Sequence, residues 1–106
     1  MNKVILTGNL TKAITKKNLD NGICVAESSL AVNYRGNKNT ETCYIDLVVY
    51  GSIANVLYQY AKIGIKLLVE GRLKQDIWKD SKGATKNKHY IVVERIEFLA
   101  NKKDKK

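Results

Sequence analysis

The sequence predicts an all-β fold, a small barrel of five strands with one helix between the third and the fourth. Three observations predict it. Apolar and polar residues alternate through most of the 106 residues, which is the period of a half-buried strand. One segment, directly after Gly51, changes to the period of a helix. Turn-forming or polar stretches separate the alternating segments, and the length suits a single domain.

The expected strands each end at a turn or a polar connection. They cover residues 3–10, 23–34, 42–51, 65–80 and 86–100. The run Asp20-Asn21-Gly22 predicts a tight turn before the second strand, because Asn-Gly tolerates positive φ. Residues 11–19 are polar and predict no strand, while 35–41 form a polar connection and Ser81-Lys82-Gly83 a second turn.

The helix is predicted from spacing. Its apolar stripe falls at i, i+3, i+4 and i+7 and consists of Ile53, Val56, Leu57 and Tyr60. Ser52 is expected to cap its start and Gly64 to end it. Three strands, a helix and two strands is the order of an OB-fold Greek-key barrel, whose helix closes one end. We expect this domain to cover residues 1–100 and a basic, disordered tail to cover 101–106.

Composition favours binding over catalysis. Nineteen Lys and Arg against ten Asp and Glu give a net charge of +9, which favours a polyanionic partner, nucleic acid first. His89 is the single histidine, and Cys24 and Cys43 lack the C-x-x-C spacing of zinc and redox sites. We therefore expect no catalytic residue, metal or cofactor. Without an apolar run of about 18 residues, we expect no membrane contact and a cytoplasmic location with reduced thiols.

The strand at 65–80 predicts a basic face that carries an aromatic residue. Alternation turns one set of side chains into the barrel, namely Leu67, Val69, Gly71, Leu73 and Ile77. The other set faces outward and includes Arg72, Lys74 and Trp78, the only tryptophan. An outward indole beside cations is typical of a platform that stacks on bases of single-stranded nucleic acid. The competing interpretation is a ring that caps a barrel end or lies in a subunit interface.

Tyrosines extend this interpretation. Tyr44 and Tyr50 share the outward face of the strand at 42–51, roughly 20 Å apart, a spacing that suits successive bases. Cross-strand packing is the alternative for both. Tyr34 stands where the second strand meets a polar loop, and either stacking or packing fits it. Phosphates would be bound by basic residues, for which a plain solvated surface is the alternative: Lys3, Lys62, Lys66, Arg72, Lys74 and Lys79.

Ordered motifs resemble one known family. They are MNKVILTGNL at 1–10, Asn-Gly at 21–22 followed by Val-Ala and Ser-Leu-Ala, TCYIDLVVYG at 42–51, the helix through residue 64, and VEGRL at 69–73 leading to WKD and Gly83. Together they resemble bacterial single-stranded DNA-binding proteins (SSB) over residues 1–99. The resemblance implies an OB fold, a homotetramer, and sequence-tolerant binding of single-stranded DNA (ssDNA) in replication, recombination and repair.

The resemblance also implies which residues act. Bases would stack at Tyr44, Tyr50 and Trp78, and a further family aromatic falls at Tyr34 or Gly36. Asp76 and Ile77 stand where relatives often carry cations. Relatives usually continue into a tail with an acidic tip that recruits partners, whereas this sequence ends basic at Lys106. The alternatives are a piece trimmed to the DNA-binding core and a naturally tailless relative of phage or plasmid origin, and in either case we expect no tail-dependent partners.

Two other functions fit the sequence. A primosomal protein of the PriB type is also a short OB protein, which binds ssDNA as a dimer, so the mass of the oligomer separates it from a tetramer. An RNA-binding OB module is compatible with the charge as well. Competition between ssDNA and structured RNA distinguishes that module from the other two.

Overall fold

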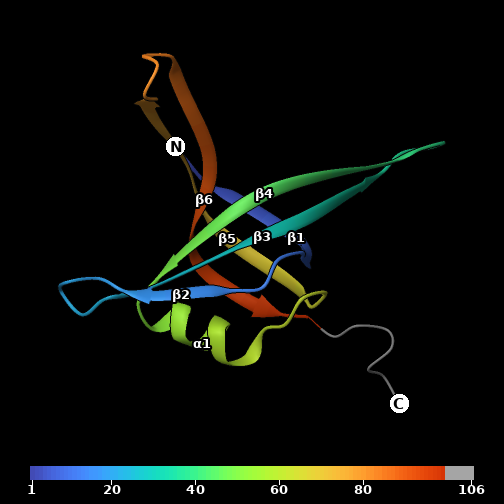
Figure 1. Ribbon diagram of the computed structural model, residues 1–106. Helices are drawn as coiled ribbons and strands as arrows, with labels where there is room; N and C mark the ends of the chain where they lie inside the picture. The colour runs from blue at the N-terminus through green and yellow to red at the C-terminus, as the bar shows by residue number, and fades with distance from the viewer. Residues whose placement is uncertain (100–106) are drawn as a thin grey trace.

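The computed structural model describes residues 1–99, which form six strands and one helix (Figure 1). In chain order these are β1 (Val4–Leu10), β2 (Thr15–Asn18), β3 (Cys24–Arg35), β4 (Thr40–Tyr50), α1 (Ser52–Tyr60), β5 (Lys66–Lys79) and β6 (Thr85–Phe98). The predicted basic tail at 101–106 lies outside the described residues, as does Ala100.

Five of the strands close into a barrel. Their hydrogen-bonded order is β1-β5-β6-β4-β3, and a short β1–β3 pairing at Asn9 and Leu10 closes the ring. All neighbours are antiparallel except β4 and β6, which run parallel from Asp46 and Tyr90 onward. With α1 between the third and fourth barrel strands, this is the predicted OB-fold barrel, and the prediction is confirmed.

The core fills the barrel and the end that α1 covers. Its largest fully buried side chains are Leu10, Leu30, Leu47, Val49, Leu57, Leu67, Val69 and Ile91. On β4 and β5 the buried residues fall at every second position, as alternation predicts. Ala54 and Leu57 are the buried residues of α1, which lies below the barrel in Figure 1 and packs mainly on β3.

Two glycines permit close approaches that shape the barrel. A Cβ on Gly8 would lie 2.3 Å from the carbonyl oxygen of Ala31, where β1 crosses β3 to close the ring. A Cβ on Gly71 would lie 2.1 Å from the carbonyl oxygen of Val92. Gly71 faces a bulge, because Glu70 pairs with Arg95 and Gly71 with Val93, which leaves Glu94 as the extra residue of β6.

The strand β2 was not predicted. It folds back on β3 through the turn at residues 19–23, in which Gly22 has a φ of 85° and Ile23 N–H donates to the Asn21 side chain. The Asn-Gly turn was thus correctly placed, but the strand before it was missed. All four β2 side chains are exposed, so the sequence there shows no alternation from which a strand could be predicted.

Both predicted ends of the helix were wrong. Gly51, with a φ of 76°, occupies the N-cap position, and no side chain caps the helix. The Gly51 carbonyl accepts from the N–H groups of Ala54 and Asn55, so the left-handed glycine already turns the chain from β4 into α1. At the other end the chain becomes extended at Ala61, before Gly64. The predicted stripe is only partly buried, since Tyr60 is 63% exposed.

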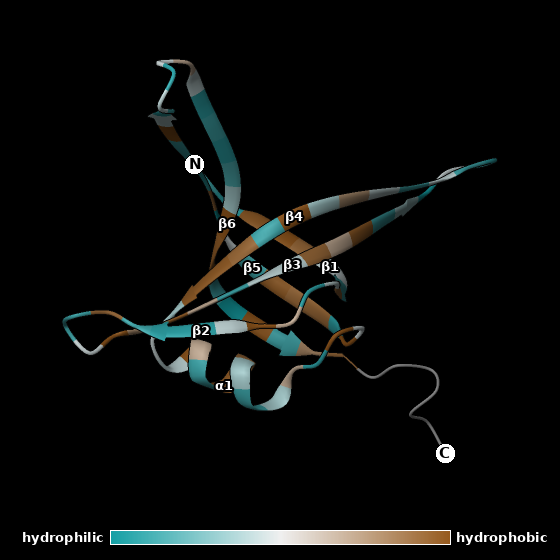
Figure 2. Cartoon of the chain, viewed as in Figure 1, coloured by the Kyte–Doolittle hydropathy of each residue, from teal (hydrophilic) through white to brown (hydrophobic). Residues whose placement is uncertain are grey.

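Two hairpins extend beyond the barrel as arms (Figure 1). The β3–β4 arm comprises residues 32–45 and the β5–β6 arm residues 73–89, and they diverge beyond the first β4–β6 pair. Figure 2 shows apolar ribbon through the barrel, but polar ribbon on outer β6 and at the tip of the β3–β4 arm. Within residues 1–99, no helix is long and apolar enough to cross a membrane.

The prediction that Leu73 and Ile77 line the barrel was wrong, because both residues lie on the β5–β6 arm. Leu67, Val69 and Gly71 are buried, whereas Leu73 is 44% and Ile77 65% exposed. Their alternation is intact, but β5 has left the barrel at these positions, so this side of the strand is exposed. Cys43 on the other arm is exposed for the same reason.

Candidate nucleic-acid interface

One continuous sheet surface carries the predicted aromatic residues of β4 and β5. Residues paired across neighbouring strands point to the same side of a sheet. Asp46 on β4 pairs with Tyr90 on β6, and Tyr90 pairs with Lys74 on β5. Residues two apart share a side, so this surface, here called the outer face, contains Tyr44, Tyr50 and Trp78.

The three rings on the outer face are open to solvent. Trp78 is 48% exposed, Tyr44 67% and Tyr50 43%. Trp78 lies near the end of the β5–β6 arm, Tyr44 lies on the β3–β4 arm, and Tyr50 lies at the opposite end of β4, beside α1. The rings therefore spread along the outer face, and each leaves π-surface for a base to cover.

Tyr34 is placed differently. It is 68% exposed and pairs with Glu41, so it points to the side of the β3–β4 arm opposite Tyr44. The structure therefore does not bring Tyr34 together with the other three rings.

The predicted cations divide into three groups. Lys74 and Arg72 lie on the outer face, where the Arg72 guanidinium is 3.1 Å from a Glu94 carboxylate oxygen. Lys79 lies next to Trp78 but on the opposite side of β5. The third group lies on the barrel itself: Lys3 beside Glu70, Lys62 in the turn after α1, and Lys66 at the start of β5.

The cations on the barrel lie far from Trp78. Lys66 and Trp78 are twelve positions apart on β5, which is about 40 Å for an extended strand. A nucleic acid that contacts both Lys66 and Trp78 must run along most of β5, from the barrel out onto the arm.

Sequence reasoning missed the cations of β6. Lys86 pairs directly with Trp78, and Lys88 pairs with Asp76, so both belong to the outer face. The signal was present, because counting outward equally from Lys82 in the predicted turn matches Trp78 with Lys86. Neighbouring Tyr90 is buried in spite of facing outward, and its hydroxyl donates to Asp76 over 3.1 Å.

Carboxylates hold two lysines on this side of the molecule. Lys88 Nζ lies 3.0 Å from an Asp46 oxygen, and its hydrogen bond to that carboxylate raises the pKa of Lys88. The hydrogen bond from Lys3 to Glu70 raises the pKa of Lys3 and lowers that of Glu70. Both lysines are therefore charged at neutral pH.

A shallow hollow of about 200 Å³ opens beside the Asp46–Lys88 pair. Its lining includes Lys12 from the connection between β1 and β2, Thr15 from β2, and Glu27, Asp46 and Lys88. Residues 1–99 contain no group of three His, Cys, Asp or Glu side chains placed to hold a metal ion. What the outer face offers is aromatic surface and positive charge.

The family model described as "Single-strand binding protein family" matches residues 1–99. The chain belongs to this family. Proteins named single-stranded DNA-binding protein are similar to it along nearly its whole length. That of Wolinella succinogenes is 37% identical over 95% of this chain, that of Helicobacter hepaticus 39% over 95%, and that of Helicobacter pylori 34% over 97%.

The SSB-family chain is shorter than those relatives and spans 65%, 62% and 60% of their lengths. Its fold also matches a solved structure described as the Plasmodium falciparum SSB complex with ssDNA. That likeness has a TM-score of 0.86 at 27% identity and covers 94% of this chain and 96% of the other.

Proposed function

We propose that this protein binds single-stranded DNA without sequence preference and acts by binding alone. The observation that carries the proposal is the outer face, where Tyr44, Tyr50 and Trp78 are exposed on one sheet surface that also carries lysines. Membership of the single-strand binding family and likeness to a complex with ssDNA support it.

The geometry favours unpaired strands over duplexes. Bases of a single strand are free to stack on separate rings, whereas the bases of a duplex already stack on one another. Every base has a π-face, so stacking tolerates any sequence. Lys74, Lys86 and Arg72 lie between or beside the rings and would neutralise phosphates.

The remaining predicted residues take peripheral roles in this proposal. Lys3, Lys62, Lys66 and Lys79 would contact phosphates where the strand leaves the outer face and follows the barrel. Tyr34 would stack on a base that passes around the edge of the β3–β4 arm, since it points to the other side of that arm.

We infer that the protein works as a homo-oligomer, most simply the tetramer implied by the family resemblance. Exposed apolar side chains on β1, on β5 and in the turn after α1 are available for contacts between copies, among them Ile5, Ile77 and Ile63. We further infer a role in DNA replication, recombination and repair in the bacterial cytosol, in keeping with the bacterial relatives.

A fluorescence titration tests the function. Trp78 is the only tryptophan, so intrinsic emission reports directly on the proposed stacking site. We expect oligo(dT) to quench it and to bind more tightly than a duplex of equal length or a structured RNA. Tighter binding of the RNA would favour the RNA-binding module, and absence of quenching with oligo(dT) would contradict stacking at Trp78.

Sizing by light scattering tests the assembly. A mass near four times 11.9 kDa is expected. A stable dimer would instead favour the PriB-type protein, and a monomer at micromolar concentration would contradict an oligomer.

A further inference from the structure

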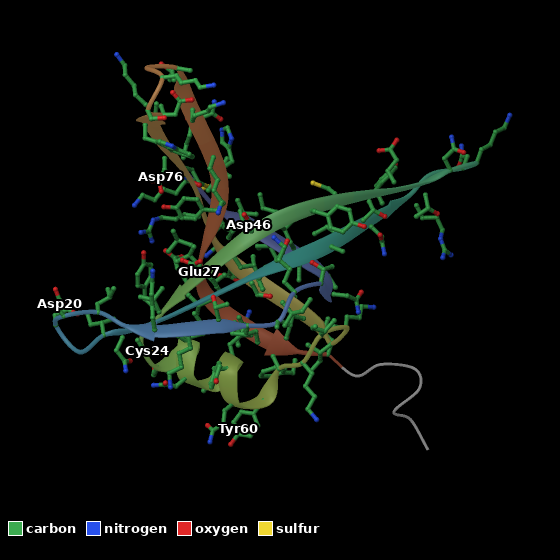
Figure 3. The ribbon with its side chains drawn as sticks, viewed as in Figure 1. Asp20, Cys24, Glu27, Asp46, Tyr60 and Asp76 are labelled. Atoms are coloured by element: carbon green, nitrogen blue, oxygen red, sulfur yellow. The ribbon has the colours of Figure 1, made fainter. Side chains whose placement is uncertain are left out.

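One ion pair joins the strands from which the two arms diverge. Lys88 on β6 and Asp46 on β4 are 3.0 Å apart, with side chains 50% and 34% exposed. Among the ion pairs found within residues 1–99, this one alone connects β4 to β6. Figure 3 labels Asp46 where β4 passes β6, and Asp76 farther out on the β5–β6 arm.

The position of the pair matters for the proposed function. Tyr44 lies two residues beyond Asp46 on one arm, and Trp78 lies on the other. A strand that stacks on both rings has to pass the junction of the arms, which Lys88 and Asp46 occupy together. The hollow beside them also contains Lys12, a second cation within reach of a passing phosphate.

We propose that Asp46 masks Lys88 from nucleic acid, and that it thereby lowers the affinity for ssDNA. This inference rests on the proposed function. The Asp46 carboxylate already neutralises much of the Lys88 charge and occupies one of its donors, so the ion pair competes with a phosphate for this half-exposed ammonium. Asp46 is in this sense an affinity-setting residue inside the binding face rather than a ligand of DNA.

Competition of this kind is energetically feasible. Both partners are partly exposed, and ion pairs in such positions are weak because water screens them. An unmasked lysine that meets a phosphate releases a condensed counterion, which contributes about −0.7 to the slope of log affinity against log salt. A lysine held by Asp46 makes less of that contribution.

The rival interpretation is that the pair braces the two arms in the orientation that DNA requires. The two ideas predict opposite signs. Removing the carboxylate tightens binding if Asp46 is a mask, and loosens binding if it is a brace.

The experiment compares Asp46→Asn with Asp76→Asn in the full chain, with oligo(dT) titrated at several salt concentrations. Both changes remove one negative charge from the outer face. Asp76 lies within 4.0 Å of no lysine or arginine nitrogen among the described residues and accepts a hydrogen bond from Tyr90 instead. It is therefore the control for a carboxylate that neighbours Lys88 across the strands but forms no ion pair with it.

We expect Asp46→Asn to tighten binding roughly two- to five-fold at moderate salt, the range for an exposed ion pair. Its salt slope should steepen by about 0.7. Asp76→Asn should leave the slope unchanged. Lys88→Gln should weaken binding, and adding Asp46→Asn to Lys88→Gln should give no more tightening than Asp76→Asn gives, because the cation to be unmasked is gone.

Three results would overturn the proposal: weaker binding by Asp46→Asn, equal tightening by Asp46→Asn and Asp76→Asn without a change of slope, or full tightening that persists without Lys88. If Asp46→Asn folds poorly, as melting curves would show, Asp46→Ser makes the same test, because it also removes the carboxylate that pairs with Lys88. A wild-type protein that fails to bind oligo(dT) would overturn the proposed function, and the mask with it. If the wild-type protein binds oligo(dT) and Asp46→Asn binds it with the same affinity and salt slope, the masking role of Asp46 is overturned and the proposed function stands.

Discussion

At the scale of single residues, Trp78 and Ile77 show how one strand separates two environments. They are neighbours on β5 and are 48% and 65% exposed, but they point to opposite sides of the β5–β6 arm. Only Trp78 shares the outer face with Tyr44 and Tyr50. The pair therefore supplies a binding residue and its matched control.

Trp78→Ala should weaken binding of oligo(dT) by about 1–3 kcal/mol, the range for losing one base–aromatic stack. Ile77→Ala should leave the affinity per folded oligomer unchanged. Trp78→Ala should keep the wild-type melting temperature, because its ring is not in the core, and any loss of melting temperature in Ile77→Ala should accompany loss of the oligomer. Anisotropy of a labelled oligonucleotide measures affinity without relying on the tryptophan. Unchanged affinity in a folded Trp78→Ala protein would refute stacking there.

Glu70 links residue-scale chemistry to stability. The hydrogen bond from Lys3 and the charges of Lys3 and Arg95 lower its pKa below the usual 4.5. A carboxyl group whose pKa is lower in the folded state stabilises the fold above its unfolded pKa. That contribution is lost as the pH falls from about 5 through the lowered folded value.

Glu70→Gln should therefore lower the melting temperature at pH 7 and flatten its decline between about pH 5 and pH 3. Glu41→Gln is the control, because Glu41 lies on the exposed β3–β4 arm and forms no ion pair among the described residues. Differential scanning calorimetry across this pH range measures both. Parallel pH profiles for wild type and Glu70→Gln would argue against the linkage.

At the scale of elements, α1 acts as a plug for one end of the barrel rather than as a capped, independent helix. Only nine residues long, it has no side-chain cap, and its buried residues are Ala54 and Leu57. Helices this short are marginal in water, so packing on the barrel must stabilise it. The side chain that enters the barrel should carry most of that energy.

Leu57→Ala should destabilise the protein by about 2–5 kcal/mol, because it leaves a cavity in the core. Val56→Ala is the matched control, since Val56 is the preceding residue and is 40% exposed, whereas Leu57 is fully buried. Its effect should stay within about 0.5 kcal/mol. Urea unfolding of both variants tests this, and similar losses would show that α1 does not plug the barrel through Leu57.

At the scale of the whole molecule, charge and shape act together. Of the net charge of +9, the +6 of residues 1–99 is carried on a barrel with two projecting arms, which offers more surface to a strand than a closed sphere of equal mass. Such a surface attracts a polyanion from any direction, while the rings on the outer face determine where bases stack.

Affinity for oligo(dT) should therefore fall steeply with salt. Three or more phosphates neutralised per subunit predict a slope of log affinity against log salt of about −2 or steeper. Titrations from low to moderate salt measure it. An affinity independent of salt would remove the lysines from the mechanism and leave stacking alone.

Much of this molecule follows from local sequence pattern. Alternation located the barrel strands, the Ser-Lys-Gly turn located the β5–β6 hairpin, the Asn-Gly motif located the turn before β3, and a change of period located α1. Tyr44, Tyr50 and Trp78 all occupy outward positions in the alternating pattern, which placed each of them on the outward side of its own strand. These features are local, because the two sides of a strand are set by neighbouring residues in the chain.

Other features depended on what lies next to a residue in space. Alternation assigns Leu73 and Ile77 a side of the strand, but only the point where β5 leaves the barrel decides that this side is uncovered. The parallel register of β4 and β6 likewise decided that Asp46 holds Lys88. The sequence by itself determined the five barrel strands, the turns at Asn21-Gly22 and Ser81-Lys82-Gly83, and the two sides of each barrel strand. The tertiary structure decided which sides are buried and which charges meet, because burial and ion pairing are properties of contacts between segments distant in the chain.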